Sequence, residues 1–165
     1  MIGFSSEFLK ILGVSGLGAL IVAGIGGFLT ETGPWYRSLR NPAWKPPDWA
    51  FGPVWMIILG CAAFSAAYAW EAAPDMPAKT SILLAFGLNG LLNIFWNVLF
   101  FSFRRPDWAF YEVGFLWLSV LAALLVVAPF SVWAAQLMIP YLIWVAIAAL
   151  LNYRVVQLNR PFGTD

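Results

Sequence analysis

The sequence predicts an all-α membrane protein, a bundle of five transmembrane helices forming a single domain over residues 1–165. Of its residues, 62% are hydrophobic and only 10% are charged, whereas a soluble domain carries about 25% charged residues. The mean hydropathy is +0.80, and five long apolar runs are separated by polar or proline-rich segments. So little charge cannot cover a surface that faces water, so we expect the lipid bilayer to surround the chain.

Each predicted span is long enough to cross a hydrocarbon core of about 30 Å at a helical rise of about 1.5 Å per residue. The spans cover residues 8–29, 51–70, 80–102, 107–128 and 132–157. A cleaved signal peptide is the alternative for the first run. This run is long for such a peptide, its start is not net positive and it has no clear cleavage site, so we expect a span.

The stretch WYRSLRNPAWKPPDWAFGPVW, residues 35–55, interrupts the apolar runs. Its prolines disfavour a continuous helix, and we expect Pro53 in the first turn of the second span, where proline is tolerated. The stretch also holds four tryptophans and three basic residues, Arg37, Arg40 and Lys45. We interpret this loop between helices one and two as a rigid cap over a central ligand pocket.

Basic residues are unequally divided between the two ends of the predicted bundle. One end holds Lys10 and Lys79, and the other holds seven: Arg37, Arg40, Lys45, Arg104, Arg105, Arg154 and Arg160. Cytoplasmic segments of membrane proteins carry the excess of lysine and arginine. We therefore expect the loop 31–50 and the C-terminus in the cytoplasm and the N-terminus outside.

The residue types also exclude several kinds of chemistry. The chain has no histidine and one cysteine, Cys61, so we expect no metal site, no disulfide and no strongly ligated haem. The net charge of +1 suggests no nucleic-acid partner. No acid–base pair or nucleophile–base pair is visible, which disfavours ordinary hydrolytic or transfer enzymes.

Polar residues occur inside three spans, where they are costly unless they meet a partner or a cavity. Asn89, Asn93 and Asn97 lie at steps of four on one helix face, with Trp96 beside them. They either hydrogen-bond to other helices or line a ligand cavity. Glu112, in the fourth span, is either a proton-handling group or, as we predict, the partner of an arginine among Arg104, Arg105 and Arg154.

The fifth span presents Tyr141, Trp144 and Ala148 on one face. A small residue flanked by aromatic residues admits a flat ligand, and it also admits another helix. The tryptophans at span ends are expected interfacial anchors: Trp49, Trp70, Trp108 and Trp133. Five further tryptophans are candidate ligand contacts: Trp35, Trp44, Trp55, Trp96 and Trp144.

Four motifs in order resemble one known family. They are residues 35–55, given above, LNIFWNVLFF (92–101), WAFYE (108–112) and PYLIWVAIAALLNY (140–153). The chain resembles a bacterial-type member of the translocator protein family, also called tryptophan-rich sensory proteins or peripheral-type benzodiazepine receptors. The resemblance implies a five-helix bundle, often a homodimer, in a bacterial membrane, inner or outer, or in the mitochondrial outer membrane.

The family binds porphyrins such as protoporphyrin IX, sterols and benzodiazepine-site ligands, which the resemblance implies here as expectations. The pocket and lid positions it implies are Trp35, Trp44, Trp55, Asn89, Asn93, Trp96, Tyr141, Trp144 and Ala148. Trp35 and Trp144 match two tryptophans linked in some bacterial members to light-dependent porphyrin breakdown.

Several positions depart from the family pattern. Asn89 stands where many members have glutamine, Leu59 where many have tyrosine, and Asp48 where some have histidine. Arg154 follows Tyr153 directly, so the proposed sterol motif, which needs one to five residues between them, fails. We therefore do not expect sterol to be a ligand of this chain.

A metal-free porphyrin is the ligand that the residues favour, with no separate cofactor. Aromatic walls suit its flat ring, and the loop residues Arg37, Arg40 and Lys45 suit its acidic tails. We expect a membrane receptor or transporter-like protein, in tetrapyrrole regulation or stress sensing. The alternatives are a light-dependent porphyrin-degrading enzyme and a membrane interaction protein with a vestigial pocket.

Overall fold

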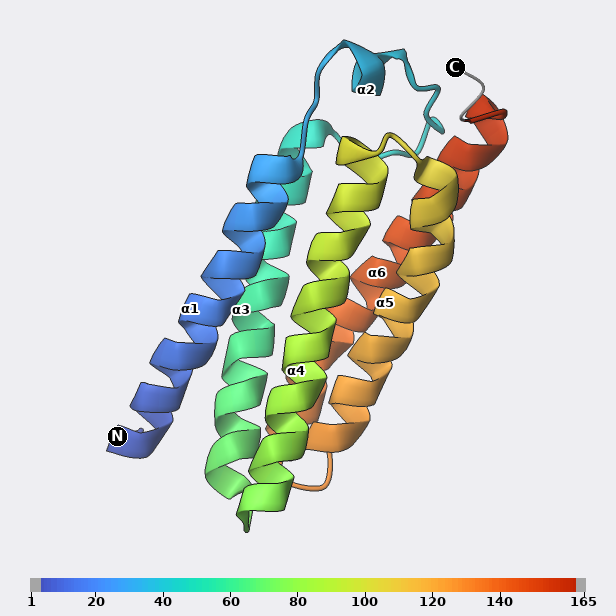
Figure 1. The fold of residues 1–165 in the computed structure, drawn as a ribbon. Coiled ribbons are helices and arrows are strands. Elements are labelled where there is room, and N and C mark those ends of the chain that lie inside the picture. Colours follow the sequence, from blue (N-terminus) through green and yellow to red (C-terminus); the bar gives the residue numbers. More distant parts are fainter. Residues whose placement is uncertain (1–3, 163–165) are drawn as a thin grey trace.

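A computed structural model describes residues 4–162, and its five long helices run side by side (Figure 1). They are α1 (Ser6–Leu29), α3 (Asp48–Ala72), α4 (Met76–Asn97), α5 (Pro106–Val127) and α6 (Val132–Asn159). Each is long and apolar enough to cross a membrane, which confirms the predicted five-helix membrane fold. α1 begins at one end of the bundle and α6 ends at the other (Figure 1).

Side-chain caps begin three of the helices. Ser5, Asp75 and Ser131 accept hydrogen bonds from backbone N–H groups in the first turns of α1, α4 and α6, which satisfies donors that a helix leaves unpaired. α3 begins at Asp48, directly after the extended Pro47, so Pro53 lies inside the helix. The expectation that Pro53 occupies the first turn is therefore wrong, since the helix starts earlier than the apolar run.

The loop end of the bundle contains two irregular segments. A short helix, α2 (Pro34–Ser38), lies within the proline-rich loop. After α4 the chain widens into one π-helical turn, η1 (Val98–Ser102), and Arg104 then adopts a φ of 53° before α5 begins. Within this π turn three consecutive side chains, those of Leu99, Phe100 and Phe101, are buried.

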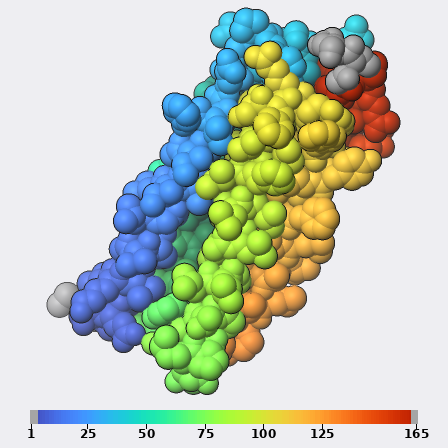
Figure 2. Space-filling view, viewed as in Figure 1, coloured from blue at the N-terminus to red at the C-terminus, as the bar shows by residue number. Residues whose placement is uncertain are grey.

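α1 is the peripheral helix of the bundle. In its most apolar stretch of 18 residues, only 6% is buried inside the bundle, against 39% for the corresponding stretches of α3 and α5. It packs chiefly on α3 and α4, while α5, α6 and α3 enclose the main core. In Figure 2 the surfaces of α1 and α4 separate toward the start of α1, and α3 is visible between them.

Candidate functional site: an aromatic cavity beneath the loop

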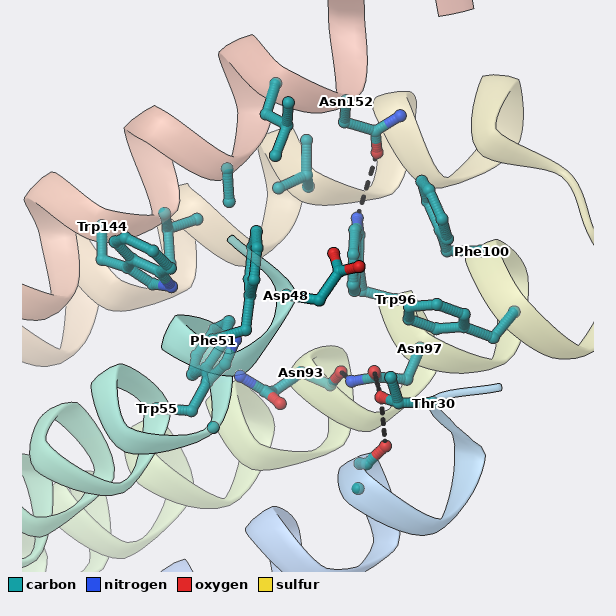
Figure 3. Close-up of a pocket in the computed structure, with 18 of the residues that line it drawn as sticks. Thr30, Asp48, Phe51, Trp55, Asn93, Trp96, Asn97, Phe100, Trp144 and Asn152 are labelled. Atoms are coloured by element: carbon teal, nitrogen blue, oxygen red, sulfur yellow. Dashed lines mark hydrogen bonds between the residues drawn. The ribbon is translucent and has the colours of Figure 1, made fainter. Parts of the chain in front are cut away.

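A cavity of about 390 Å³ lies among the helices directly beneath the loop. Its volume falls within the range of about 300–1,000 Å³ typical of small-molecule pockets. All five long helices contribute to its walls (Figure 3). Its aromatic lining residues are Tyr36, Phe51, Trp55, Trp96, Phe100, Phe101 and Trp144. Its polar and charged lining residues are Thr30, Thr32, Asn41, Lys45, Asp48, Asn93, Asn97 and Asn152.

The aromatic rings hold one another in place. Phe51 meets Trp144 edge-on with ring centroids 5.7 Å apart, and Trp96 stacks on Phe100 at 5.0 Å. The indole N–H of Trp96 also donates to Asn152 Oδ1 (3.2 Å), and Asn152 Nδ2 donates to the Pro106 carbonyl (2.8 Å). These contacts fix the Trp96 ring in one orientation, so the cavity presents preformed flat apolar surfaces.

The opposite wall is polar and comes from α1 and α4. Asn93 Nδ2 donates to the hydroxyl of Tyr141 (3.0 Å), and Asn97 Nδ2 donates to the Asn93 carbonyl (3.0 Å). The Thr30 hydroxyl donates to the Gly26 carbonyl (2.8 Å). A Cβ on Gly26 would lie 3.4 Å from Asn97 Nδ2, so this glycine lets α1 approach the asparagine closely.

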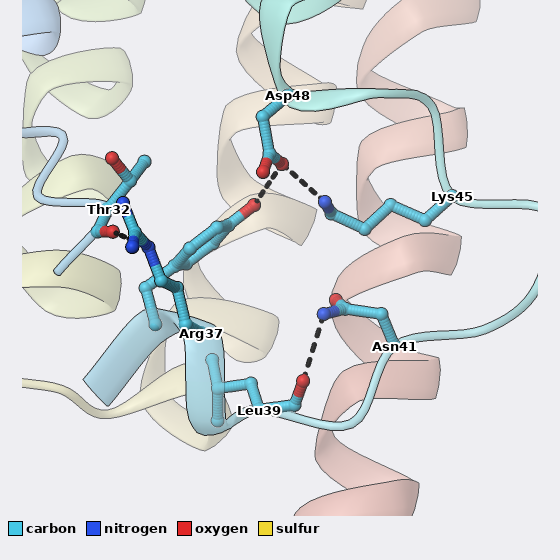
Figure 4. Close-up of polar contacts among 7 residues, drawn as sticks. Thr32, Arg37, Leu39, Asn41, Lys45 and Asp48 are labelled. Carbon is cyan, nitrogen blue, oxygen red and sulfur yellow. Dashed lines mark hydrogen bonds and ion pairs between the residues drawn. The ribbon is translucent and has the colours of Figure 1, made fainter. Parts of the chain in front are cut away.

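Polar contacts hold the loop over the cavity (Figure 4). Asp48 accepts a hydrogen bond from the Tyr36 hydroxyl (2.9 Å) and forms an ion pair with Lys45. Burial, together with the bond to Asp48, raises the pKa of Tyr36. Burial alone would lower the pKa of Lys45, but the interactions with Asp48 and Tyr36 together outweigh it and the pKa is raised. Arg37 Nε donates to the Thr32 carbonyl (3.1 Å), which fixes the start of the loop.

The loop is also clamped to the end of α6. The backbone N–H of Arg40 donates to Asn159 Oδ1 (2.8 Å), and Asn159 Nδ2 donates back to the Arg40 carbonyl (2.9 Å). Nearby, Trp35 meets Phe100 edge-on at 6.1 Å, and the guanidinium of Arg104 lies 5.9 Å from the Trp35 ring centroid. The loop is therefore attached to the bundle at two places, the end of α6 and the π turn after α4.

The structure brings five of the nine predicted site residues into the cavity lining: Trp55, Asn93, Trp96, Trp144 and Ala148. The other four are Trp35, Trp44, Asn89 and Tyr141. Trp35 packs outside on Phe100, and Trp44 is 47% exposed. Asn89 donates to the Ser119 hydroxyl (2.9 Å), so it makes a helix–helix contact. Tyr141 is fully buried behind Trp55, with ring centroids 5.9 Å apart.

The predicted pairing of Glu112 with an arginine is wrong. Glu112 is only 5% exposed, and neither carboxyl oxygen has a hydrogen-bond partner among the described residues. Arg105 instead forms an ion pair with Asp107, and Arg154 donates to Gln157 (2.8 Å). These arginines use partners close to them in sequence at the loop end of the bundle, while Glu112 lies further along α5.

Several cavity residues were not predicted from the sequence as ligand contacts. Phe51 and Phe100 carry no polar or positional signal within long apolar runs, and Thr30 is an ordinary polar residue just after the first predicted span. The position of Phe100 depends on the π turn, which the sequence does not indicate. Lys45 was expected to meet the acidic tails of a porphyrin, whereas its ion pair with Asp48 was not predicted.

The arrangement favours binding of a flat apolar molecule. Aromatic rings supply most of the surface, and amides and one ion pair supply the polar contacts. Across residues 4–162 there is no group of three or more histidine, cysteine or acidic side chains that could hold a metal ion.

Comparison with known proteins gives consistent matches over most of the chain. The sequence model of the protein family described as TspO/MBR family matches residues 15–158. The chain is 30% identical over 146 residues to a tryptophan-rich protein TspO of Chlorobaculum tepidum, covering 87% of this chain and 92% of the relative. It is 36% identical over 128 residues to the translocator protein of Homo sapiens, covering 76% and 75%. It is 32% identical over 133 residues to a tryptophan-rich sensory protein of Cereibacter sphaeroides, covering 81% and 82%.

Proposed function

Because this chain belongs to the TspO/MBR family, we propose that it is a membrane receptor or transporter-like protein that binds metal-free porphyrins and related flat apolar molecules. The names of its relatives, translocator protein and tryptophan-rich sensory protein, agree with a transport or sensory role. The observation that carries the proposal is the aromatic cavity of about 390 Å³ enclosed beneath the loop.

The ring of the ligand would lie against the side chains of Trp55, Trp96 and Trp144. These side chains come from α3, α4 and α6, so they contact a flat molecule from several directions. Aromatic stacking contributes about 0.5–1.5 kcal/mol per pair beyond the burial of area.

The acidic tails of a porphyrin would meet the mouth of the cavity. Of the three basic residues expected there, only Lys45 lines the cavity. Arg37 is held by the Thr32 carbonyl, and the backbone of Arg40 is held by Asn159. A carboxylate tail would therefore compete with Asp48 for the Lys45 ammonium group, and binding would loosen the contact between loop and α3.

A fluorescence titration of the full chain in lipid nanodiscs with protoporphyrin IX tests this function. We expect saturable quenching of tryptophan emission, and a Kd about tenfold higher in Trp144→Leu, because losing one aromatic contact and its buried area costs about 1–2 kcal/mol. The matched control is Trp133→Leu, since Trp133 is 70% exposed at the far end of the bundle. Absence of saturable quenching would refute the proposal and favour a membrane interaction protein with a vestigial pocket.

Illumination of the same samples tests light-dependent degradation. Pigment loss beyond free bleaching that disappears in Trp35→Phe and Trp144→Phe would favour the enzyme. In the structure Trp144 lines the cavity and Trp35 does not, so we expect binding without degradation.

We further propose that the protein is a homodimer with its loop in the cytoplasm. Seven of nine basic residues lie at the loop end of the bundle, which supports this orientation. Labelling of Trp44→Cys in a Cys61→Ala background by a membrane-impermeant thiol reagent tests it. Labelling from the outside in intact cells would contradict the cytoplasmic position of the loop. Light scattering in detergent measures the oligomeric state and tests the homodimer separately.

A further inference from the structure

A second, wholly apolar hollow of about 240 Å³ lies between α1 and α3. Its walls include Gly16 and Ala19 on α1 and Gly60 and Ala63 on α3. Leu20, which also lines it, is 57% exposed on the surface that faces lipid. The hollow is therefore open to the bilayer, not sealed inside the bundle.

The two hollows meet at three residues. Ala23, Met56 and Leu59 line both the central cavity and the groove between α1 and α3. All three are apolar, and the unbranched Met56 side chain, 52% exposed, can adopt several conformations. None of the three carries a hydroxyl, amide or charged group, so this junction has no hydrogen-bonding side chain for an apolar molecule to displace.

The other end of the cavity lies beneath the fastened loop. The loop is fastened by the Tyr36–Asp48 hydrogen bond, by the Lys45–Asp48 ion pair and by the Asn159 clamp on α6. Displacing the loop to widen this end would have to break these contacts together.

Along the groove, by contrast, few polar contacts hold α1. The Ser15 hydroxyl donates to the Ala63 carbonyl (3.0 Å), and Thr30 makes a long contact with Asn97 (3.4 Å). Between these two points the α1 residues that meet α3 and α4 are apolar or small, so separating α1 there breaks no side-chain hydrogen bond found in the described residues.

We propose that the ligand of the central cavity enters and leaves through the bilayer, between α1 and α3, past Ala23, Met56 and Leu59. The proposal rests on the proposed function, because it assumes that the cavity binds a flat apolar molecule. Such a molecule partitions into hydrocarbon, so it already concentrates on the side where the groove opens.

Stopped-flow quenching by protoporphyrin IX of the full chain in nanodiscs tests this route. Gly60→Leu and Gly16→Leu place a side chain in the groove from opposite walls, and neither glycine lines the cavity. A Cβ at either position meets nothing within 4 Å, so the side chain can be accommodated. Gly87→Leu is the matched control, because a Cβ on Gly87 likewise meets nothing within 4 Å, but this glycine lies on α4 and is exposed.

We expect both groove variants to slow association and dissociation about tenfold each while Kd stays within about twofold, since they narrow the route without changing the bound state. Asn159→Ala, which frees the loop, should leave both rates unchanged. Saturable binding with unchanged rates in both groove variants, or faster exchange in Asn159→Ala, would overturn the route alone. Absence of saturable binding in the unsubstituted chain would refute the proposed function and, with it, the route.

Discussion

The clamp between the loop and α6 gives a quantitative prediction. Asn159→Ala removes both hydrogen bonds to the Arg40 backbone. Each such bond contributes about 0.5–1.5 kcal/mol net, so docking of the loop should weaken by about 1–3 kcal/mol. Converted at about 1.4 kcal/mol per factor of ten, this is about a 5- to 150-fold increase in the open population of the loop.

Hydrogen–deuterium exchange in nanodiscs measures this population through the loop amides, including that of Lys45, which donates to the Pro42 carbonyl (3.1 Å). Protection there should fall by the predicted factor, while amides in the middle of α5 keep theirs. Asn159→Asp is the matched control, because it keeps an acceptor for the Arg40 N–H. It should weaken the docking of the loop by about half the free energy lost in Asn159→Ala. Equal protection in Asn159→Ala and the unsubstituted protein would refute the idea that this residue holds the loop.

Three further predictions follow from buried and loop residues. Asn93→Ala and Tyr141→Phe each leave one half of a buried hydrogen bond unpaired, so each should lower stability by about 1–3 kcal/mol in thermal unfolding, and the double variant should cost less than the sum. Glu112→Leu removes a buried carboxyl that has no partner in the described residues and should raise the Tm, whereas a fall would indicate an unseen partner. The pKa values of Lys45 and Tyr36 are both raised in the folded protein. The stability that the two groups give the loop is therefore complete below their ordinary pKa values of 10.5 and 10.0, and it is lost as the pH rises through the folded-state values. Proteolysis of the loop should therefore accelerate above about pH 10, and insensitivity to pH up to 11.5 would contradict this.

The sequence allowed the five spans and the loop to be predicted because length and apolar character are enough to define a membrane helix. It predicted less about which side chains share the cavity. Asn89, Asn93 and Asn97 do lie along one face, but the cavity ends above Asn89, which meets Ser119 on α5 instead. Where the cavity ends depends on how α4 and α5 approach each other. The periodicity of helices that are apolar on all sides does not indicate this approach.

The remaining differences have local causes. The π turn at Val98–Ser102 shifts Phe100 into the cavity wall, and single residues give no signal for such a turn. The partner predicted for Glu112 was wrong because arginines near the same membrane face were assumed to reach it, yet Arg105 pairs with Asp107. Charge pairing at a membrane surface is decided by depth as well as by spacing.

The sparse packing of α1 bears on how the chain assembles. α1 is made first, but its main partners, α3 and α4, are made later. A 24-residue apolar helix satisfies its own backbone in lipid, so it can wait in the bilayer as an independent span while α3 to α6 form the core. Packing of α1 would then be the last step of assembly. Before that step the chain would already hold Trp55, Trp96 and Trp144 together, but these side chains would be open to lipid on one side.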